Sequence, residues 1–455
     1  MTFACALLLS ACAAVNWRLF RSVLCPPVLF SGLWAAILFG LVLSGSDFYE
    51  LSLTTLGLCL LSVLSLSLGY RFVGPLRRNA CRTLQARNPP YERLYLLRLL
   101  DIALGLCVAI LPVYWRRLST ISQESLDPNF LRGVRAQMVS VDAGLAVSGS
   151  DFFTYVLPVM TIMTLIATVE SYRGRERKWR IAAWTIVSLS YYIPTGSRLA
   201  TIVLLVSVVC AMALSSGRLR LRTVLAAGVV FVPIYSFAAI TLGKGGSPFA
   251  DTGENASGLA HSFRLYALSG IVACDQAIQA GTSTGGRQMR SLRFFYALGR
   301  GLGLDVDVPD AIDGPIATPD ITNVYTVYYY YFKDFGWLGV AAIFVALGAL
   351  LRILFNHARS GRPEATVLSG LSCAFLVLTS VGDPFLRGLS LCIQVAGEVF
   401  FVYRLSRLIG STVARRFQRH SAAASSSATT YAELGRPREQ LVARIGTGRQ
   451  QHAVT

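Results

Sequence analysis

The sequence predicts an all-α protein of the polytopic membrane class, a helical bundle with about eleven transmembrane helices. Of its 455 residues, 54% are hydrophobic and only 15% are charged, whereas soluble domains carry about 25% charged residues. The apolar runs are continuous and do not alternate with polar residues, which excludes a closed β-barrel. The predicted spans are 2–16, 23–45, 51–70, 95–115, 152–171, 180–195, 198–216, 223–242, 335–355, 366–383 and 388–409.

The first apolar run, 2–16, has two interpretations. The stretch LSAC, which ends at Cys12, resembles a bacterial lipoprotein cleavage box. A signal peptide begins with a positively charged segment, however, and no Lys or Arg precedes Cys12. We therefore expect this run to be retained as a short first helix.

Basic residues are distributed unevenly between the two sides of the predicted membrane. When the gaps between spans are assigned alternately, 29 of the 42 Lys and Arg residues fall on one side. The positive-inside rule makes that side cytoplasmic. Eleven spans then place the N-terminus outside and the C-terminus inside. The net charge of +18 does not indicate nucleic acid as a partner, because the basic residues lie in short gaps between spans.

Two domains follow from this pattern. A transmembrane bundle covers 1–410 and includes a large outer loop, 243–334, which begins with a Gly- and Ser-rich stretch. Within that loop, residues from Leu259 to Cys274 follow a 3-4 apolar spacing, which predicts a short helix over 256–280. The segment 411–455 is predicted to be a disordered basic cytoplasmic tail.

Arg198 lies at a break between two spans, in the stretch YYIPTGSRLATIVLL (191–205). The predicted topology puts it at the outer edge of the membrane. One interpretation is an arginine that snorkels to the interface. The other is an anion site, because an arginine binds phosphate bidentately and a helix N-terminus adds donors and a favourable dipole.

Further arginines gather on the predicted outer side. Arg287, Arg290 and Arg293 recur every three residues and so share one helical face. One interpretation of this stripe is contact with anionic lipid headgroups. The other is a charge clamp, shared with Arg264, for a lipid-linked pyrophosphate. Pyrophosphate gains negative charge as its bond to a sugar breaks, and arginines placed there stabilise that charge.

The sequence gives no support for a metal or cofactor site. The DVD stretch at 305–307 resembles the D-x-D motif of metal-dependent glycosyltransferases, but it lies on the predicted outer side, whereas nucleotide sugars are made in the cytoplasm. We interpret it as a solvated acidic turn. Only Cys274 of the ten cysteines falls in an outer loop, so no disulfide framework is expected there.

The segment TNVYTVYYYYFKDFGWLGVAAIFVALGALL resembles the late motif of the Wzy-type oligosaccharide repeat-unit polymerases of O-antigen and exopolysaccharide assembly. Two shorter stretches are similar to earlier motifs of that family: GSR at 196–198, and FRLYALSGIVACDQAI, where Ser269 and Cys274 replace the usual Gly and Phe. The resemblance covers about 190–355. The residues that match the late motif are Thr322, Asn323, Tyr325, Thr326, Asp334, Phe335, Gly336, Gly339 and Gly348.

This resemblance implies a glycosyltransferase of the GT-C type in the bacterial cytoplasmic (inner) membrane, with its active site facing the periplasm. Such an enzyme transfers an oligosaccharide chain from undecaprenyl pyrophosphate onto a new lipid-linked repeat unit. The implied partners are the lipid-linked donor and acceptor, the lipid bilayer and a chain-length regulator protein. The resemblance implies no nucleic acid, no metal and no cofactor.

The resemblance also gives hypotheses for the arginines. Arg198 would neutralise the pyrophosphate, together with some of the other outer arginines. The members of this second group are Arg264, Arg287, Arg290 and Arg293.

Asp334 and His261 are the candidates for the general base, which must reach the acceptor hydroxyl within hydrogen-bond distance. Both have structural alternatives: Asp334 as the partner of Lys333 or of a nearby arginine, and His261 as an interface residue on a loop helix. Tyrosines stack on sugar rings and donate hydroxyls where an apolar surface meets water. The residues expected to line the sugar path are Asn323, Tyr325, Tyr328 and Tyr331.

Two other functions stay open on the sequence. An O-antigen ligase moves the same donor onto lipid A core, and the banding of lipopolysaccharide separates it from a polymerase. A flippase or other transporter for lipid-linked oligosaccharides is the non-enzymatic alternative. A transporter is expected to carry polar residues along several spans and to lack a long outer segment.

Overall fold

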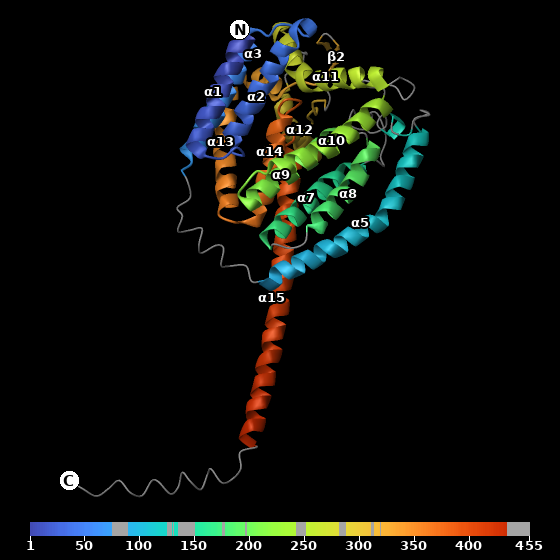
Figure 1. Ribbon diagram of the computed structural model, residues 1–455, viewed down its shortest axis with the longest axis vertical. Helices are drawn as coiled ribbons and strands as arrows, with labels where there is room; N and C mark the ends of the chain where they lie inside the picture. Colours follow the sequence, from blue (N-terminus) through green and yellow to red (C-terminus); the bar gives the residue numbers. More distant parts are fainter. Residues whose placement is uncertain are drawn as a thin grey trace, which may run out of the picture.

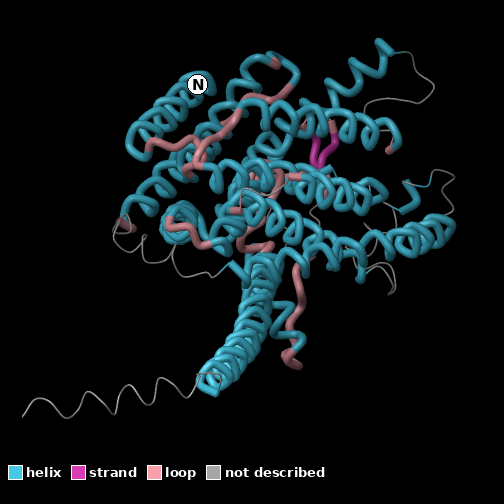
Figure 2. The backbone as a smooth tube through the Cα atoms, turned by 60° about the horizontal axis from the view of Figure 1, so that its bottom comes forward, coloured by secondary structure: helices cyan, strands magenta, loops and turns pink. Residues whose placement is uncertain are grey.

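The computed structural model shows a helical body from which one long helix projects (Figure 1). Among the described residues the only strands form a two-stranded antiparallel hairpin, seen in magenta in Figure 2. The described residues are 1–74, 90–124, 130, 132–134, 151–174, 178–195, 198–242, 252–281, 288–310, 314–318 and 320–434.

Eight helices within the described ranges are long and apolar enough to cross a membrane. Continuous apolar runs adopt helices because a helix satisfies its backbone hydrogen bonds internally, without help from water. This confirms the prediction of an all-α, multi-pass bundle. The eight are α1 (Thr2–Phe20), α2 (Pro26–Leu43), α3 (Leu53–Phe72), α5 (Pro90–Glu124), α9 (Arg198–Ser216), α10 (Leu221–Thr241), α13 (Val327–Arg359) and α15 (Leu389–Leu434).

The other three predicted spans also lie in helices. They are found in α7 (Asp151–Arg173), α8 (Trp179–Tyr192) and α14 (Pro363–Leu378). With 14 and 16 residues, α8 and α14 are shorter than the roughly 20 residues that a span requires. The count of eleven spans and the GT-C-like fold therefore stay predictions.

The predicted outer loop contains several short elements. Its principal helix, α11 (Thr252–Gln279), corresponds to the segment expected to be helical, and the C-terminal half of α11 is buried from Leu268 onward. In Figure 1 the N-terminus, α11 and β2 lie at one end of the body, and the stem of α15 leaves the opposite end. The remaining short elements are η1 (Gly45–Asp47), η2 (Ile193–Thr195), η3 (Arg290–Leu292), α12 (Arg293–Gly301), β1 (Ile316–Ala317) and β2 (Ile321–Thr322).

The disordered tail over 411–455 stays a prediction, although the structure describes 411–434 as helical. This stretch continues α15 as far as Leu434. It contains no Gly or Pro and is rich in alanine, and extending an existing helix requires no new nucleation. Gly435 and Pro437 follow in the sequence. Residues 435–455, the remainder of the predicted tail, lie outside the described residues.

A backbone break divides α13 into two helical pieces. Gly336 has φ 64° and ψ −165°, a conformation outside the helical region that only glycine adopts readily. The four tyrosines Tyr328 to Tyr331 precede this break, and the apolar membrane segment follows it. The start of the predicted span at 335 therefore coincides with the break at Gly336.

Glycines allow α3 and α13 to cross in close contact. A Cβ atom at Gly348 of α13 would meet the carbonyl oxygen of Leu66, and one at Gly69 of α3 would meet the carbonyl oxygen of Val345. Small residues at helix crossings are typical of membrane proteins, because packing and not water exclusion holds such helices together. The contact fixes α13 against the N-terminal helices.

Replacing Gly348 with leucine is expected to disrupt the bundle. The larger side chain would force α3 and α13 apart, a change of about 3 kcal/mol or more in the free energy of unfolding. The purified variant should lose its monodisperse peak on size-exclusion chromatography and melt at a lower temperature. Gly105→Leu is the control, because a Cβ atom at Gly105 meets nothing within 4 Å. Equal behaviour of the two variants would contradict the close crossing.

The core has two main parts. One packs α1, α2, α3, α11 and α13 around Trp34, Tyr328 and Phe344. The other packs α5, α7, α8, α9, α14 and α15 around Trp184 and Tyr192. All five of these large side chains are almost fully buried. The two parts together make the body that carries the outer-loop elements.

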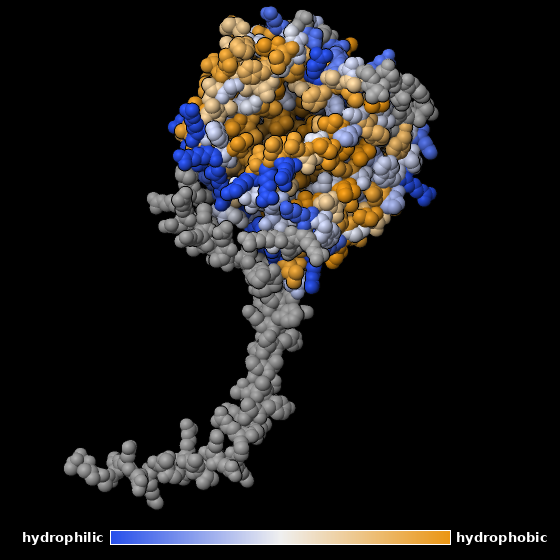
Figure 3. Space-filling model, viewed as in Figure 1, coloured by the Kyte–Doolittle hydropathy of each residue, from blue (hydrophilic) through white to orange (hydrophobic). Residues whose placement is uncertain are grey.

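Apolar side chains also cover much of the outer surface. In Figure 3, hydrophobic residues occupy most of the middle of the visible face, and hydrophilic residues gather along its margins and in its lower part. Large apolar patches of this kind mark a membrane or interaction surface. The most exposed large apolar side chains on the spanning helices include Leu43, Val113, Val229 and Leu338. This distribution fits a body surrounded by lipid.

Candidate functional site

A cavity of about 570 Å³ lies at the end of the body that carries α11 and the hairpin. Three separate parts of the chain form its wall: the first residue of α9, one face of α11, and the segment from the hairpin turn to Val324. Its polar lining residues are Arg198, His261, Ser262, Tyr266, Ser269, Thr318, Asp320, Thr322 and Asn323. Three predicted site residues, Arg198, His261 and Asn323, are therefore brought together.

Arg198 is held in place by two tyrosines and a serine. Its guanidinium carbon lies 5.0 Å from the centre of the Tyr235 ring and 5.1 Å from the centre of the Tyr266 ring. Nη1 donates hydrogen bonds to the hydroxyls of Tyr235, at 3.1 Å, and Ser262, at 3.4 Å. Cation–π contacts of this kind position a guanidinium without neutralising its charge.

The charge of Arg198 is placed for an anion in the cavity. No carboxylate among the described residues pairs with it. Arg198 is also the first residue of α9, where the helix dipole disfavours a positive charge. Both the arginine and the helix N-terminus would attract a negative group. Gly196 and Ser197, the other two residues of the GSR motif, lie outside the described residues.

His261 and Asp320 form a pair on the wall of the same cavity. Nε2 of His261 lies 3.0 Å from Oδ2 of Asp320. Their side chains are 54% and 53% exposed, so a ligand in the cavity can reach both. A carboxylate at Nε2 favours the tautomer in which Nδ1 accepts a proton, which is the arrangement that a general base needs.

The hairpin positions Asp320. Ile316 pairs with Thr322, and Ala317 pairs with Ile321. At the turn, both the amide and the hydroxyl of Thr318 donate to the carbonyl oxygen of Asp320, at 2.8 and 2.9 Å. Asp320 was not among the predicted site residues. The Pro-Asp dipeptide before the late motif marks a turn, and that was the available signal.

The other predicted arginines do not line this cavity. Arg264 pairs on the surface with Asp47, with Nη1 and Oδ2 2.7 Å apart. Nε of Arg293 donates to the carbonyl oxygen of Pro309 at 2.9 Å. Arg290 begins η3. Arg287 lies outside the described residues. Of the predicted arginines that the structure describes, Arg198 alone faces the cavity.

Asp334 does not face the cavity that holds Arg198 and His261. Its Oδ2 accepts a hydrogen bond of 2.7 Å from the backbone amide of Ser291, which fastens η3 to α13. Lys333, the partner considered for Asp334, instead donates to the Tyr329 hydroxyl at 3.2 Å. The geometry thus gives Asp334 a structural contact, and it leaves His261 as the candidate base in the cavity.

Asp334→Asn separates these two roles. An asparagine oxygen can still accept the Ser291 amide, so we expect the amount of folded protein and the rate of the transfer reaction that the resemblance implies to stay within about twofold of wild type. Loss of a true general base lowers the rate of a reaction by about 10²–10⁴-fold. The rate of that transfer in lipid vesicles, normalised to the amount of folded protein, provides the measurement. A hundredfold loss of rate in this variant would show that Asp334 acts in catalysis after all.

The three predicted tyrosines are buried in the core and do not line the cavity. The Tyr325 hydroxyl donates to the carbonyl oxygen of Gly314 at 2.7 Å, and burial raises its pKa above the ordinary value. Tyr328 accepts a hydrogen bond from Ser62 at 3.0 Å. The three hydroxyls are thus occupied within the fold. A period-3 pattern of tyrosines fits packing as well as sugar binding, and packing is what the structure shows.

Tyr331 connects α13 to the turn before α15. Its hydroxyl donates to Oδ1 of Asp383 at 2.7 Å. The Asp383 carboxylate also accepts the backbone amides of Phe385, Leu386 and Arg387. Burial raises the pKa of Asp383, although these hydrogen bonds oppose the shift. The tyrosine therefore orders a turn of the chain.

A second, mostly apolar cavity of about 330 Å³ lies beside α9. Its wall includes Leu199, Ala200 and Val203, on the same helix whose first residue is Arg198. Further wall residues come from α7, α14 and α15, among them Ile162, Leu378 and Leu391. The apolar wall of this cavity thus begins one residue after Arg198, at Leu199.

Within the described residues, no group of three or more His, Cys, Asp or Glu side chains could hold a metal ion. Comparisons of the chain with models of protein families, with curated proteins and with solved structures gave no match.

Proposed function

We propose that this chain polymerises lipid-linked glycans: it transfers an oligosaccharide from undecaprenyl pyrophosphate onto a new lipid-linked repeat unit at the outer face of a bacterial inner membrane. The observation that carries the proposal is one cavity that contains an unneutralised arginine and a His–Asp pair. The reaction needs those two groups at one place, a cation for the leaving pyrophosphate and a base for the acceptor hydroxyl.

The reaction can be written with these residues. The acceptor hydroxyl attacks the anomeric carbon of the donor sugar, a new glycosidic bond forms, and the bond from that carbon to the pyrophosphate oxygen breaks. Nδ1 of His261 takes the proton of the hydroxyl, and Asp320 stabilises the imidazolium through Nε2. Arg198 stabilises the charge that develops on the leaving pyrophosphate. Asn323 and Ser269 supply polar groups on the cavity wall for the sugar.

The position of the cavity supports the lipid-linked part of the proposal. The cavity lies at one end of an apolar helical body, where headgroups meet water, and the second cavity beside α9 offers room for part of an isoprenoid chain. The end with α11 and the N-terminus is the proposed periplasmic side, and the α15 stem is the proposed cytoplasmic side. The excess of Lys and Arg in the gaps on the stem side supports this orientation.

The direct test uses purified chain in lipid vesicles, supplied with undecaprenyl-pyrophosphate-linked repeat units that carry a fluorescent label. We expect a ladder of longer glycans on a gel and release of undecaprenyl pyrophosphate. Transfer of the label only onto added lipid A core would identify a ligase. Movement of labelled lipid across the bilayer with no lengthening would identify a transporter. Either result would contradict the polymerase.

A further inference from the structure

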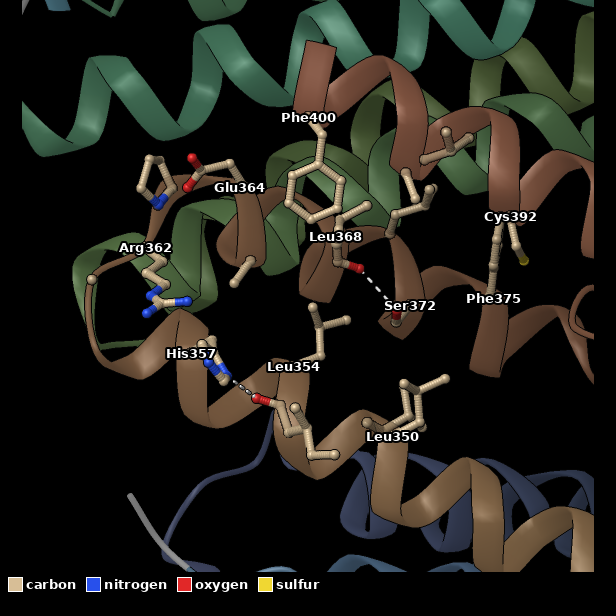
Figure 4. A pocket seen from close by; sticks show the side chains of 18 of the residues that line it. Leu350, Leu354, His357, Arg362, Glu364, Leu368, Ser372, Phe375, Cys392 and Phe400 are labelled. Atoms are coloured by element: carbon tan, nitrogen blue, oxygen red, sulfur yellow. Dashed lines mark hydrogen bonds between the residues drawn. The ribbon is translucent and has the colours of Figure 1, made fainter. Parts of the chain in front are cut away.

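A cavity of about 860 Å³ lies between α13, α14 and α15, with Arg173 of α7 at its edge. Figure 4 shows its character: His357, Arg362 and Glu364 gather at one end, and Leu350, Leu354 and Phe375 line the space beyond them. This cavity shares no lining residue with the Arg198 cavity. It borders the second cavity beside α9, since Leu371, Phe375 and Val395 belong to both walls, but the function proposed above assigns no role to it.

The apolar part of this cleft has the length of one membrane leaflet. From Arg404 at the rim to Cys392, α15 advances about 18 Å, and from Arg362 to Phe375, α14 advances about 20 Å, at 1.5 Å per residue. Half of a bilayer's hydrocarbon core is about 15 Å thick. Leu350 and Phe400 on the wall are 61% and 54% exposed, so the cleft opens to the surface of the body.

The rim carries an excess of positive charge. Arg407 pairs with Glu364, and Arg173 pairs with Glu170 at 3.3 Å. Arg362 and Arg404 are exposed, and neither pairs with a carboxylate among the described residues. Two guanidinium groups thus remain at the mouth of an apolar cleft. A guanidinium binds phosphate through a planar set of donors.

We propose that this cleft binds an anionic phospholipid of the leaflet on the side of the α13–α14 turn, which is the predicted cytoplasmic leaflet. The acyl chains lie along α13, α14 and α15, and the phosphate lies between Arg362 and Arg404. Cytoplasmic leaflets carry anionic lipids, and basic residues at that depth attract them. The bound lipid contacts both the C-terminal half of α13 and α15, and it fills the space that the protein side chains leave between them.

The charge of the rim argues against a neutral lipid as the occupant. A zwitterionic headgroup brings an ammonium together with its phosphate, so it carries no net charge to balance the two arginines. An anionic phospholipid supplies both the net negative charge for the rim and the acyl chains for the apolar wall.

The test measures binding to the full-length chain in detergent micelles, with soluble dioctanoyl phosphatidylglycerol as the probe. We expect saturable binding that also raises the melting temperature of the wild-type protein. The double variant Arg362→Ala/Arg404→Ala should bind the probe at least about tenfold more weakly, because it loses hydrogen bonds to a charged phosphate. Ser372→Phe, which fills the apolar cleft without changing charge, should weaken binding as well.

Arg218→Ala/Arg220→Ala is the matched control. It removes the same charge from the same predicted side, in the exposed connection between α9 and α10, and neither residue lines the cleft. We expect its affinity for the probe to match wild type. The proposal is overturned if the control weakens binding as much as the cleft variant, or if the cleft variant binds normally. Equal affinity for dioctanoyl phosphatidylcholine, or tighter binding of undecaprenyl phosphate than of phosphatidylglycerol, also overturns it.

The lipid-site experiment measures binding, so its outcome does not depend on whether the chain extends glycans. A failed polymerase assay leaves the lipid site intact as a proposal, and a failed binding assay leaves the polymerase intact.

Discussion

Arg198→Ala is expected to abolish glycan extension, with a loss of at least about 10²–10³ in rate, because it removes the group that stabilises the leaving pyrophosphate. The labelled lipid-linked substrate should persist as single repeat units, with no ladder. Arg198→Lys should retain only a small part of the activity, since lysine keeps the charge but not the planar set of donors. The measurement is the vesicle assay, with the amount of folded protein checked by size-exclusion chromatography.

Arg300→Ala serves as the control for this variant. Arg300 is an exposed arginine of α12 in the same outer segment, and it does not line the Arg198 cavity. Its removal changes the net charge by the same amount, so we expect normal ladders. If Arg198→Ala also gives normal ladders while the protein is present in normal amount, the role of Arg198 is refuted.

His261→Ala is expected to lower the extension rate by about 10²–10⁴-fold, the usual contribution of a general base. Asp320→Asn should have a smaller effect in the same direction, because the ring stays in the cavity but loses the carboxylate that orients it. Both changes should appear mainly in kcat and leave KM for the lipid-linked substrate close to wild type. Single-turnover rates at saturating substrate measure the effect.

Ser257→Ala is the matched variant on the same helix. Ser257 is exposed, and its hydroxyl donates to the carbonyl oxygen of Glu254 without reaching the cavity. It should extend glycans at the wild-type rate. A His261 variant that alters KM alone would show that the histidine binds substrate and does not move its proton.

Much of the fold could be predicted from hydropathy, because in a membrane a long apolar run has few alternatives to a helix. Hydropathy is a weaker guide to the length of a helix and to the residue at which it ends. The run in α8 is helical but has only 14 residues, and α15 continues past the predicted end of the bundle because nothing in 411–434 interrupts it.

The candidate site was predictable only in part. Arg198, His261 and Asn323 were all named from the sequence, Asn323 through the resemblance, and they do share a cavity. Asp320 was missed because the β1–β2 hairpin brings it next to His261 of α11. A two-residue strand pairing of this kind gives no clear pattern in a single sequence. Asp334 was named because it belongs to a motif, and it does not line this cavity. Neighbours in a motif can point in different directions, and Asp334 points to Ser291.

The long stem of α15 also bears on how the orientation can be measured. The 23 residues from Thr412 to Leu434 advance about 33 Å along a helix, well past the headgroup layer. A green fluorescent protein or alkaline phosphatase fused after Leu434 would therefore stand clear of the bilayer and fold without crowding. Fluorescence would report a cytosolic end, and phosphatase activity would report an exported one.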